Sequence, residues 1–220
     1  MVTERQICVP ASMVSSFVNL HRFKCKYESF ACLLSRHYID SLCHYLTPFQ
    51  IASRKKKEQK QKNQKDFYLK KAFRGELDMK TIPKYLHAQI RGLVQEAEEG
   101  LEGAREIRVP CNGYTIIGSP DGFLDGRVAE FKSRGNYFIQ NIRDKIQLCC
   151  YCMGTKKDGL LRQRLGKKVR DTVYSYKEMS DFWKEIIPVL DETIAEFRLC
   201  LEGKLEPEKR KFVKFWLKRS

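Results

Sequence analysis

The apolar residues of this chain change their spacing near residue 107, and this change most constrains the fold. Before it they recur at helical intervals, whereas after it they form short segments bounded by turn residues. These segments are Ile107 to Val109, Tyr114 to Ile117 and Val128 to Lys132. The pairs between them, Asn112-Gly113 and Asp125-Gly126, are typical of β-hairpin turns. The pattern predicts a meander of strands with helices before and after it.

Helical spacing dominates both sides of this meander. Ser12 is a suitable N-cap for a helical region that extends to about Leu46. Pro83 would begin a second helix, which ends near Gly100 or Gly103. The other predicted elements are a helix over Tyr137–Met153, a strand over Thr172–Tyr176 and a helix over Ser180–Leu201 with a kink at Pro188. No repeat or flexible linker divides the chain, which we interpret as one domain.

The chain carries a large excess of positive charge. Its 220 residues include 42 Lys and Arg against 27 Asp and Glu, a net charge of +15. A field of this sign attracts polyanions such as nucleic acid or an anionic membrane surface. Arg54, Lys55, Lys56 and Lys57 open a basic segment that extends to Lys65. This segment is an exposed basic helix or a loop, and it either contacts a DNA backbone or is a solvated face.

A second basic segment closes the chain. Residues 209–219 place lysines and arginines between Phe212, Phe215 and Trp216. Such a mixture of charge and aromatic rings could clamp a nucleic-acid strand by stacking on its bases. It could equally dock on the core of the same chain or on another subunit.

The cysteines and the hydropathy indicate the cellular setting. No apolar stretch approaches the roughly 18 residues that a membrane span needs. The nine cysteines are an odd number, and Cys149 and Cys150 are adjacent, unlike the framework of a secreted disulfide-rich protein. We interpret Cys149, Cys150 and Cys152 as small apolar packing residues. We expect an intracellular protein, in the cytoplasm or nucleus of a cell or of a virus host, with no membrane partner.

Asp121, Glu130 and Lys132 are the residues with the clearest chemistry. Side chains alternate along a strand, so Glu130 and Lys132 lie on one face and Phe131 points to the other. If Asp121 leaves a neighbouring strand end, the two carboxylates can share a hard divalent cation, with Lys132 beside them. The alternative is a surface ion pair on an exposed strand edge, next to a simple turn.

Other polar residues fall at suggestive spacings on the predicted helices. Gln147 and Tyr151 are four residues apart, hence on one helix face, and both can donate hydrogen bonds to a phosphate or a carboxylate. They could instead form a partly buried polar stripe. Glu96 adds a third carboxylate, although with Glu98 and Glu99 it could also form a solvated acidic face.

The order of these motifs resembles that of the PD-(D/E)xK nucleases, specifically the lambda-exonuclease and RecB-like branch. The similar motifs are Arg91-Gly92-x-x-x-Glu96, Ser119-Pro120-Asp121-Gly122, Asp125-Gly126, Glu130-x-Lys132 and Gln147-x-x-x-Tyr151. The resemblance implies an α/β (α+β) fold with a restriction-endonuclease-like core, in which helices flank a central mixed β-sheet. It implies a single nuclease domain over residues 1–220. The parts of this domain would be a helical N-terminal region 1–80, a catalytic core 81–176, and a C-terminal helix and basic tail 177–220.

The resemblance also implies which residues hold a metal. Asp121, Glu130 and the Phe131 carbonyl would bind Mg²⁺ or Mn²⁺, and Lys132 would activate the attacking water. An iron–sulfur cluster, which some relatives hold, is not expected, because no Cys-x-x-Cys follows Tyr151.

The remaining motif residues would complete the site. By the same resemblance, Glu96 joins the acidic cluster from its helix, and Gln147 and Tyr151 orient the reacting groups. His87 is a rival for the position of Glu96, because many relatives in the RecB branch have histidine there. Arg134 would contact DNA together with the Arg54–Lys57 run.

These observations favour a Mg²⁺- or Mn²⁺-dependent deoxyribonuclease. We expect an exonuclease or end-processing enzyme rather than an endonuclease, acting on DNA in recombination, repair or viral DNA metabolism. Similarity to a ring-forming exonuclease suggests a homo-oligomer, although a monomer is also compatible. One alternative is a non-catalytic basic nucleic-acid-binding protein on a nuclease-like scaffold. Another is an interaction or membrane-surface protein that uses the basic segment and needs neither metal nor Asp121.

Overall fold

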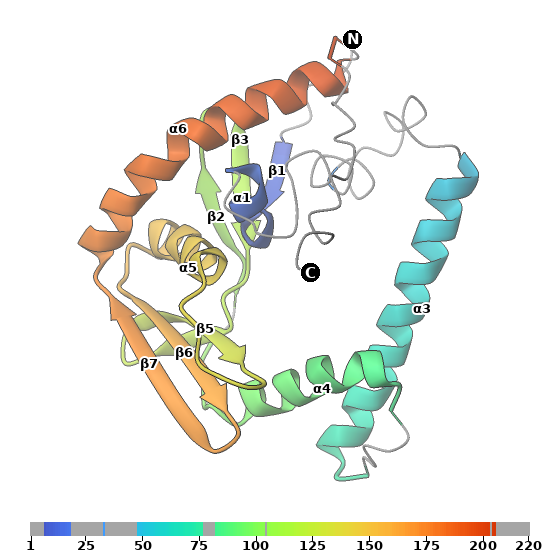
Figure 1. The fold of residues 1–220 in the computed structure, drawn as a ribbon. Coiled ribbons are helices and arrows are strands. Elements are labelled where there is room, and N and C mark those ends of the chain that lie inside the picture. The colour runs from blue at the N-terminus through green and yellow to red at the C-terminus, as the bar shows by residue number, and fades with distance from the viewer. Residues whose placement is uncertain are drawn as a thin grey trace, which may run out of the picture.

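The computed structural model describes residues 7–18, 33, 48–76, 82–103, 105–202 and 204–205, and leaves the side chains of residues 48–58, 84, 85, 88 and 201 undescribed. Within this part of the chain, five helices accompany two mixed sheets (Figure 1). The helices are α1 (Ala11–Phe17), α3 (Pro48–Phe73), α4 (Lys84–Ala97), α5 (Ile142–Thr155) and α6 (Tyr176–Leu201). The strands are β1 (Ile7–Pro10), β2 (Ile107–Pro110), β3 (Tyr114–Gly118), β4 (Gly122–Leu124), β5 (Arg127–Ser133), β6 (Gly159–Leu165) and β7 (Lys168–Tyr174).

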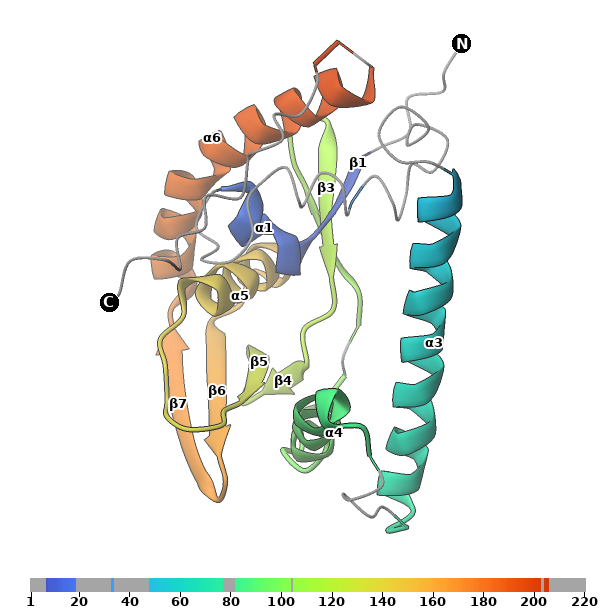
Figure 2. The same ribbon diagram turned by 45° about the vertical axis from the view of Figure 1, so that its right-hand side comes forward.

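The strands form a three-stranded sheet in the order β1-β3-β2 and a four-stranded sheet in the order β4-β5-β6-β7. Each sheet is mixed: β1 is parallel to β3, β5 is parallel to β6, and the other pairs are antiparallel. The chain passes from the first sheet to the second between β3 and β4, at residues 119–121 (Figure 2). The predicted fold class, mixed β-structure flanked by helices, is confirmed.

The predicted meander is confirmed in its strands and turns but not in its continuity. Asn112-Gly113 joins β2 to β3 and Asp125-Gly126 joins β4 to β5, each as an antiparallel hairpin. Gly113 and Gly126 have φ of 76°, and Asp125 has φ of 49°, the left-handed conformations that such turns require. Because the chain changes sheets between the hairpins, Asp121 lies at a crossover rather than inside one sheet.

Helix α5 lies against both sheets and against helices α1 and α6, in contact with strands β2, β5 and β6 (Figure 1). Burial on several sides explains its run of small and apolar residues. Cys149, Cys150 and Cys152 are at most 1% exposed, which confirms their interpretation as packing residues. None of the six cysteines in the described part of the chain forms a disulfide.

Local capping explains where the helices begin. Asn141 accepts a hydrogen bond from Arg143 N (3.0 Å), so α5 begins at Ile142, later than predicted. Ser175 and Glu178 form a capping box, so α6 begins at Tyr176, earlier than predicted, and then runs through Pro188. The predicted cap at Ser12 is wrong, because α1 begins at Ala11 after an extended Pro10.

Three strands lie outside the predicted strand segments: β1, β6 and the short β4, whose position was indicated only by the turn Asp125-Gly126. β1 is only four residues long, and it pairs in parallel with β3, more than one hundred positions along the chain. β6 alternates Arg162 and Arg164 with buried Leu161 and Gln163, a pattern that resembles a polar segment. It becomes a strand because β5 and β7 pair with it on both sides.

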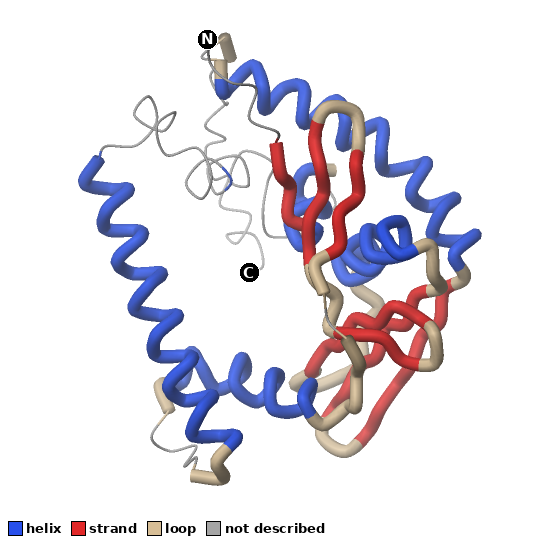
Figure 3. Tube along the Cα trace, turned by 180° about the vertical axis from the view of Figure 1, so that it is seen from behind, coloured by secondary structure: helices blue, strands red, loops and turns tan. Residues whose placement is uncertain are grey.

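Helices α3 and α4 pack together at one end of the molecule (Figure 3). Their shared apolar cluster consists of Ile82, Leu86 and Ile90, with Tyr68, Ala72 and Val94 against it. The basic segment is therefore part of a helix, although the side chains of Arg54–Lys57 lie outside the described residues. The rest of the helical region predicted up to Leu46 and the basic tail over 209–219 also lie outside them, apart from buried Leu33. In the described helices, no stretch is both long and apolar enough to cross a membrane.

Candidate active site

Glu130 and Lys132 lie on β5, an internal strand of the four-stranded sheet. The side chain of Glu130 is 1% exposed and forms an ion pair with the Lys132 ammonium, which is 22% exposed. Phe131 points the other way and is buried. The predicted alternation along the strand is confirmed, and a surface pair on an exposed edge is excluded. A buried ion pair of this kind contributes little net stability, so stability alone does not explain why it is present.

Asp121 joins this pair across the crossover. Its Oδ2 accepts a hydrogen bond from the backbone N–H of Phe131 at 2.6 Å. Burial raises the pKa of Asp121, although that hydrogen bond and the charge of Lys132 oppose the rise. The amide of Phe131 thus anchors one carboxylate next to the strand that carries the other.

Glu96 is brought to the same place by α4. The preceding residue, Gln95, accepts a hydrogen bond from Ser133 Oγ of β5 at 2.6 Å, and Gly92 faces the same serine. Burial and the negative charge of Asp121 raise the pKa of Glu96 to about 7, against the opposing effect of Lys132. Glu96 and Asp121 also line one cleft, so Glu96 lies beside Asp121 rather than on a separate acidic face.

His87 lies elsewhere on α4. Its Nε2 is 2.7 Å from the carbonyl oxygen of Ile82, just before the helix begins. In the described residues its ring is therefore held at the start of α4, whereas Glu96 is near its end. Of the two rivals, the structure brings Glu96 to Asp121.

The electrostatics of this cluster suit a divalent cation. Burial raises the pKa of Glu130 to about 8, and the charges of Asp121 and Asp144 add to the rise against the attraction of Lys132. Glu130 Oε2 is buried and has no hydrogen-bond partner among the described residues. Carboxylate oxygens are the ligands that Mg²⁺ and Mn²⁺ prefer, and a cation bound beside Asp121 and Glu130 would stabilise their ionised forms. In the described part of the chain, however, no three His, Cys, Asp or Glu side chains are already arranged as a metal-binding group.

Gln147 and Tyr151 lie one turn apart on α5, as predicted. Gln147 Nε2 donates a hydrogen bond to Tyr151 Oη at 3.0 Å. Tyr151 is buried, and its pKa is raised by that burial and by the charges of Glu130 and Asp121. Its ring packs against Gly118, where an added Cβ would lie 2.9 Å from Tyr151 Cε1. The pair is therefore near the carboxylates, with Tyr151 fixed by close packing.

Arg134 has a different setting from the one expected of a DNA contact. Its guanidinium is 12% exposed, pairs with Asp144 Oδ2 at 2.6 Å and donates from Nε to Gln163 Oε1 at 2.7 Å. Asp144 and Gln163 are fully buried. The charge of Asp144 also raises the pKa of Glu130 and Lys132, so this network lies beside the site. Sequence reasoning missed both partners, because neither belongs to a motif.

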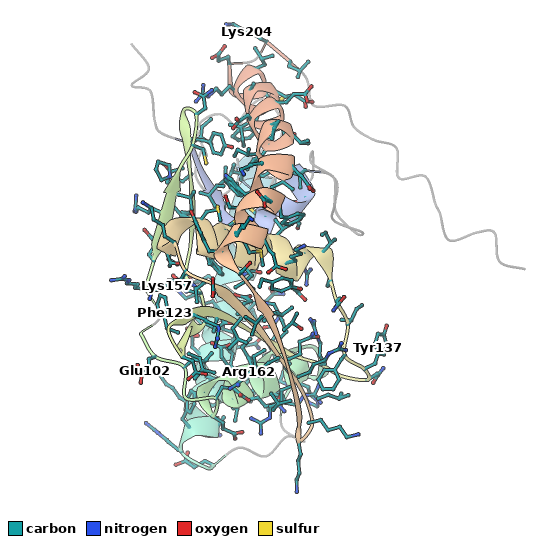
Figure 4. The ribbon with its side chains drawn as sticks, turned by 90° about the vertical axis from the view of Figure 1, so that its left-hand side faces the viewer. Glu102, Phe123, Tyr137, Lys157, Arg162 and Lys204 are labelled. Atoms are coloured by element: carbon teal, nitrogen blue, oxygen red, sulfur yellow. The ribbon has the colours of Figure 1, made fainter. Side chains whose placement is uncertain are left out.

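A second missed group ties α4 to β6. Glu99, 7% exposed, pairs with Arg162 at 3.3 Å and Arg164 at 3.1 Å. Three residues later, Glu102 and Phe123 exchange two backbone hydrogen bonds of 3.1 and 2.8 Å. In Figure 4, Glu102, Phe123 and Arg162 all lie in the lower half of the view, around the second sheet. The segment after α4 is thus attached to both β6 and β4, and this attachment fixes the end of the helix that carries Glu96.

An open cleft of about 240 Å³ adjoins the carboxylates. Glu96 and Asp121 line it, and so do Leu69 and Phe73 from the end of α3. Helix α3, which carries the basic segment, therefore forms part of the wall of this cleft. No other described residue of α3 reaches the cleft.

Comparison with known proteins gives similarity of fold only. No protein-family model and no curated protein sequence matches the chain. A solved structure from Eubacterium rectale, named "putative exonuclease", is 10% identical, with a TM-score of 0.54 over 96% of this chain and 86% of that chain. A second structure, SSO0001, is 15% identical over 92% of this chain and 87% of that chain, and its TM-score of 0.39 is too low to bear on the fold. The chain therefore shares the fold of the Eubacterium rectale protein.

Proposed function

We propose that this chain is a divalent-metal-dependent DNA nuclease of the PD-(D/E)xK type, acting as an exonuclease or end-processing enzyme in recombination, repair or viral DNA metabolism. The observation that carries the proposal is that Asp121, held by the backbone N–H of Phe131, lies between the buried Glu130–Lys132 ion pair on β5 and Glu96, with which it lines one cleft. Nothing in the packing of the core requires three carboxylates with raised pKa values at one place. Perturbed groups that gather beside a cleft are typical of catalytic sites.

The cation, when bound, would stabilise negative charge on the scissile phosphate and acidify a water molecule. Asp121 and Glu130 are the side chains that would hold it, since Glu130 Oε2 is available and Asp121 is anchored through only one oxygen in the described structure. The Phe131 carbonyl is proposed as a third ligand on the strength of the motif resemblance. No iron–sulfur cluster is proposed.

Lys132 would act as a cation rather than as a base. Glu130 raises its pKa above the ordinary value despite burial, so the ammonium stays protonated near neutral pH. It can therefore donate a hydrogen bond to the attacking water and offset charge on the phosphate. Glu96, half-exposed with a pKa of about 7, is the better proton acceptor.

Hydrolysis forms a bond between the water oxygen and phosphorus and breaks the bond from phosphorus to the 3′ oxygen. The proton of the water passes to Glu96, and the leaving oxygen takes up a proton from solvent. The products are a 5′-phosphate and a 3′-hydroxyl. Gln147 and Tyr151 would orient Glu130 and the phosphate from α5.

DNA is the proposed partner because the field of the chain is strongly positive. The run Arg54–Lys57 lies on α3, whose described end lines the cleft beside the carboxylates. We propose that this run contacts the DNA backbone. Arg134 is a weaker proposal, since Asp144 and Gln163 already engage its guanidinium.

The test is digestion of end-labelled linear DNA and closed circular DNA with Mg²⁺, Mn²⁺ or EDTA. We expect metal-dependent loss of linear DNA, abolished in Glu130→Gln and Lys132→Met. The matched control is Lys184→Met, which breaks an exposed ion pair with Asp181 far from this cluster in the sequence. Intact DNA under every condition, with salt-sensitive DNA binding retained, would instead establish a non-catalytic binding protein on the same scaffold.

A further inference from the structure

The cleft beside the carboxylates is lined by both acidic and apolar residues. Two of its lining residues, Glu96 and Asp121, are acidic and belong to the candidate active site. The others are apolar and come from α3, α4 and the segment after α4: Leu69, Phe73, Leu93, Ala97 and Leu101. Water or a metal alone would not need such apolar walls. A ligand with an apolar flat part next to a phosphate would use both kinds of lining.

Phe73 is the unusual member of this lining. Its side chain is 61% exposed at the last residue of α3. Phe67, on the same helix, is similarly exposed at 54%, but its ring packs edge-on against Tyr68 with 5.2 Å between centroids. The ammonium of Lys71 also lies 4.9 Å from the centre of the Phe67 ring. Phe73 has no such ring or cation contact among the described residues and is presented to the cleft.

Positively charged residues continue along the same face of α3, away from the cleft. Leu69 and Phe73 are four residues apart, so they lie on one face, and Lys65 lies one turn before Leu69 on that face. Lys62 and the Arg54–Lys57 run continue along the helix. A polyanion that enters the cleft would therefore meet lysines along α3.

We propose that this cleft holds a single unpaired nucleobase of the DNA substrate, stacked on Phe73, while the neighbouring phosphate lies at Asp121 and Glu130. Stacking on an exposed aromatic ring is how proteins bind single strands without sequence preference. The acidic lining repels free anions and anionic lipid headgroups unless a cation is bound, whereas the base itself is uncharged. This inference rests on the proposed nuclease function and specifies its substrate as an unpaired strand end.

The consequence for specificity is direct. A base in a duplex must leave its partner and its stack before it can lie on Phe73, which costs free energy. Single strands and frayed ends avoid this cost. The chain should therefore bind and cleave unpaired ends in preference to blunt duplex ends.

The experiment uses the full chain and two single-stranded oligonucleotides with 2-aminopurine at the 5′ or the 3′ terminal nucleotide. Stacking quenches 2-aminopurine fluorescence, and anisotropy of a distant dye reports binding separately, both with Mg²⁺ and with phosphorothioate linkages that resist hydrolysis, so that the cation is bound and the strand stays intact. We expect quenching at one end with the native chain and with Phe67→Ala. Phe73→Ala should lose the quenching and bind roughly 5- to 140-fold more weakly. Phe73→Trp should restore both.

Quenching that survives in Phe73→Ala, or that is lost equally in Phe67→Ala, would overturn the proposal. So would quenching that is absent from the native chain at both ends. Circular dichroism of each variant checks that it folds. Because the side chain of Phe73 is exposed, its replacement should leave the fold intact. Failure here is distinguishable from failure of the nuclease function. Metal-dependent cleavage abolished by Glu130→Gln but unaffected by Phe73→Ala would leave the nuclease without this base site.

Discussion

The carboxylate of Asp121 accepts a hydrogen bond from the backbone N–H of Phe131, with 2.6 Å between Oδ2 and N. Phe131 stands between Glu130 and Lys132, so this bond ties the crossover between the two sheets to the strand that carries the buried ion pair. The position of Asp121 is thus set by main chain. A side chain that keeps the acceptor but loses the charge should therefore keep the geometry.

This relationship predicts a difference between two substitutions of Asp121. Asp121→Asn retains an oxygen that can accept from Phe131 N, so its melting temperature should stay close to that of the native chain. Its nuclease activity should fall by about 100-fold or more, because a charge at the cation is lost. Asp121→Ala should lose activity and stability together. Asp125→Asn, in the exposed turn that follows, is the matched control, and an inactive Asp125→Asn would point to misfolding instead.

The raised pKa values predict how stability depends on pH without a divalent cation. Glu96 and Glu130 titrate near 7 and 8 in the folded chain and near 4.5 when unperturbed. The folded state therefore binds more protons than the unfolded state across this window, and the free energy of unfolding should decrease as pH rises from about 4.5 to 8. Thermal melts in EDTA measure this decrease.

Two comparisons sharpen that measurement. Glu130→Gln should flatten the pH dependence, whereas Glu192→Gln, on the exposed side of α6, should leave it unchanged. Mg²⁺ should raise the melting temperature more at pH 8 than at pH 5, because it favours the ionised carboxylates. An equal effect of Mg²⁺ at both values would argue against binding at this cluster.

The ion pairs of Glu99 predict an effect on catalysis from outside the cluster. Glu99→Gln weakens the attachment of α4 to Arg162 and Arg164, and should lower the free energy of unfolding by roughly 1–3 kcal/mol. Because the end of α4 carries Glu96, kcat should fall more than KM changes. Glu98→Gln removes a more exposed contact to Arg164 and serves as control. A rise in KM with kcat intact would show that Glu99 acts on substrate binding instead.

The pair of Arg134 and Asp144 predicts a strongly destabilising substitution. Arg134→Met removes the close cationic partner of the fully buried Asp144 and leaves only the more exposed Arg143, 3.9 Å from Asp144 Oδ1, a loss expected to cost roughly 3 kcal/mol. Arg134→Met combined with Asp144→Leu should recover most of that stability. Urea denaturation of the three variants measures the values. If Arg134→Met is as stable as the native chain but binds DNA more weakly, the arginine is a DNA contact, as the sequence alone had indicated.

The sequence predicted the elements whose causes are local. The turn pairs Asn112-Gly113 and Asp125-Gly126 determine the hairpins on their own, because their backbone conformations depend on those residues. The alternation that puts Glu130 and Lys132 on one face follows from strand geometry. Where a local signal was overlooked, as with the capping box at Ser175 and Glu178, the predicted boundary was wrong although the information was present.

What the sequence by itself determined, then, is the set of strands and helices in the middle of the chain and the residue types able to perform metal-assisted hydrolysis. Only the tertiary structure decided that Glu96 rather than His87 approaches Asp121, that Glu99 meets Arg162 across 63 positions, and that Phe73 lines the cleft. The reason is physical. Local elements follow from backbone and turn energetics over a few residues, whereas contacts between distant residues depend on how whole helices and sheets pack, and no short motif encodes that packing.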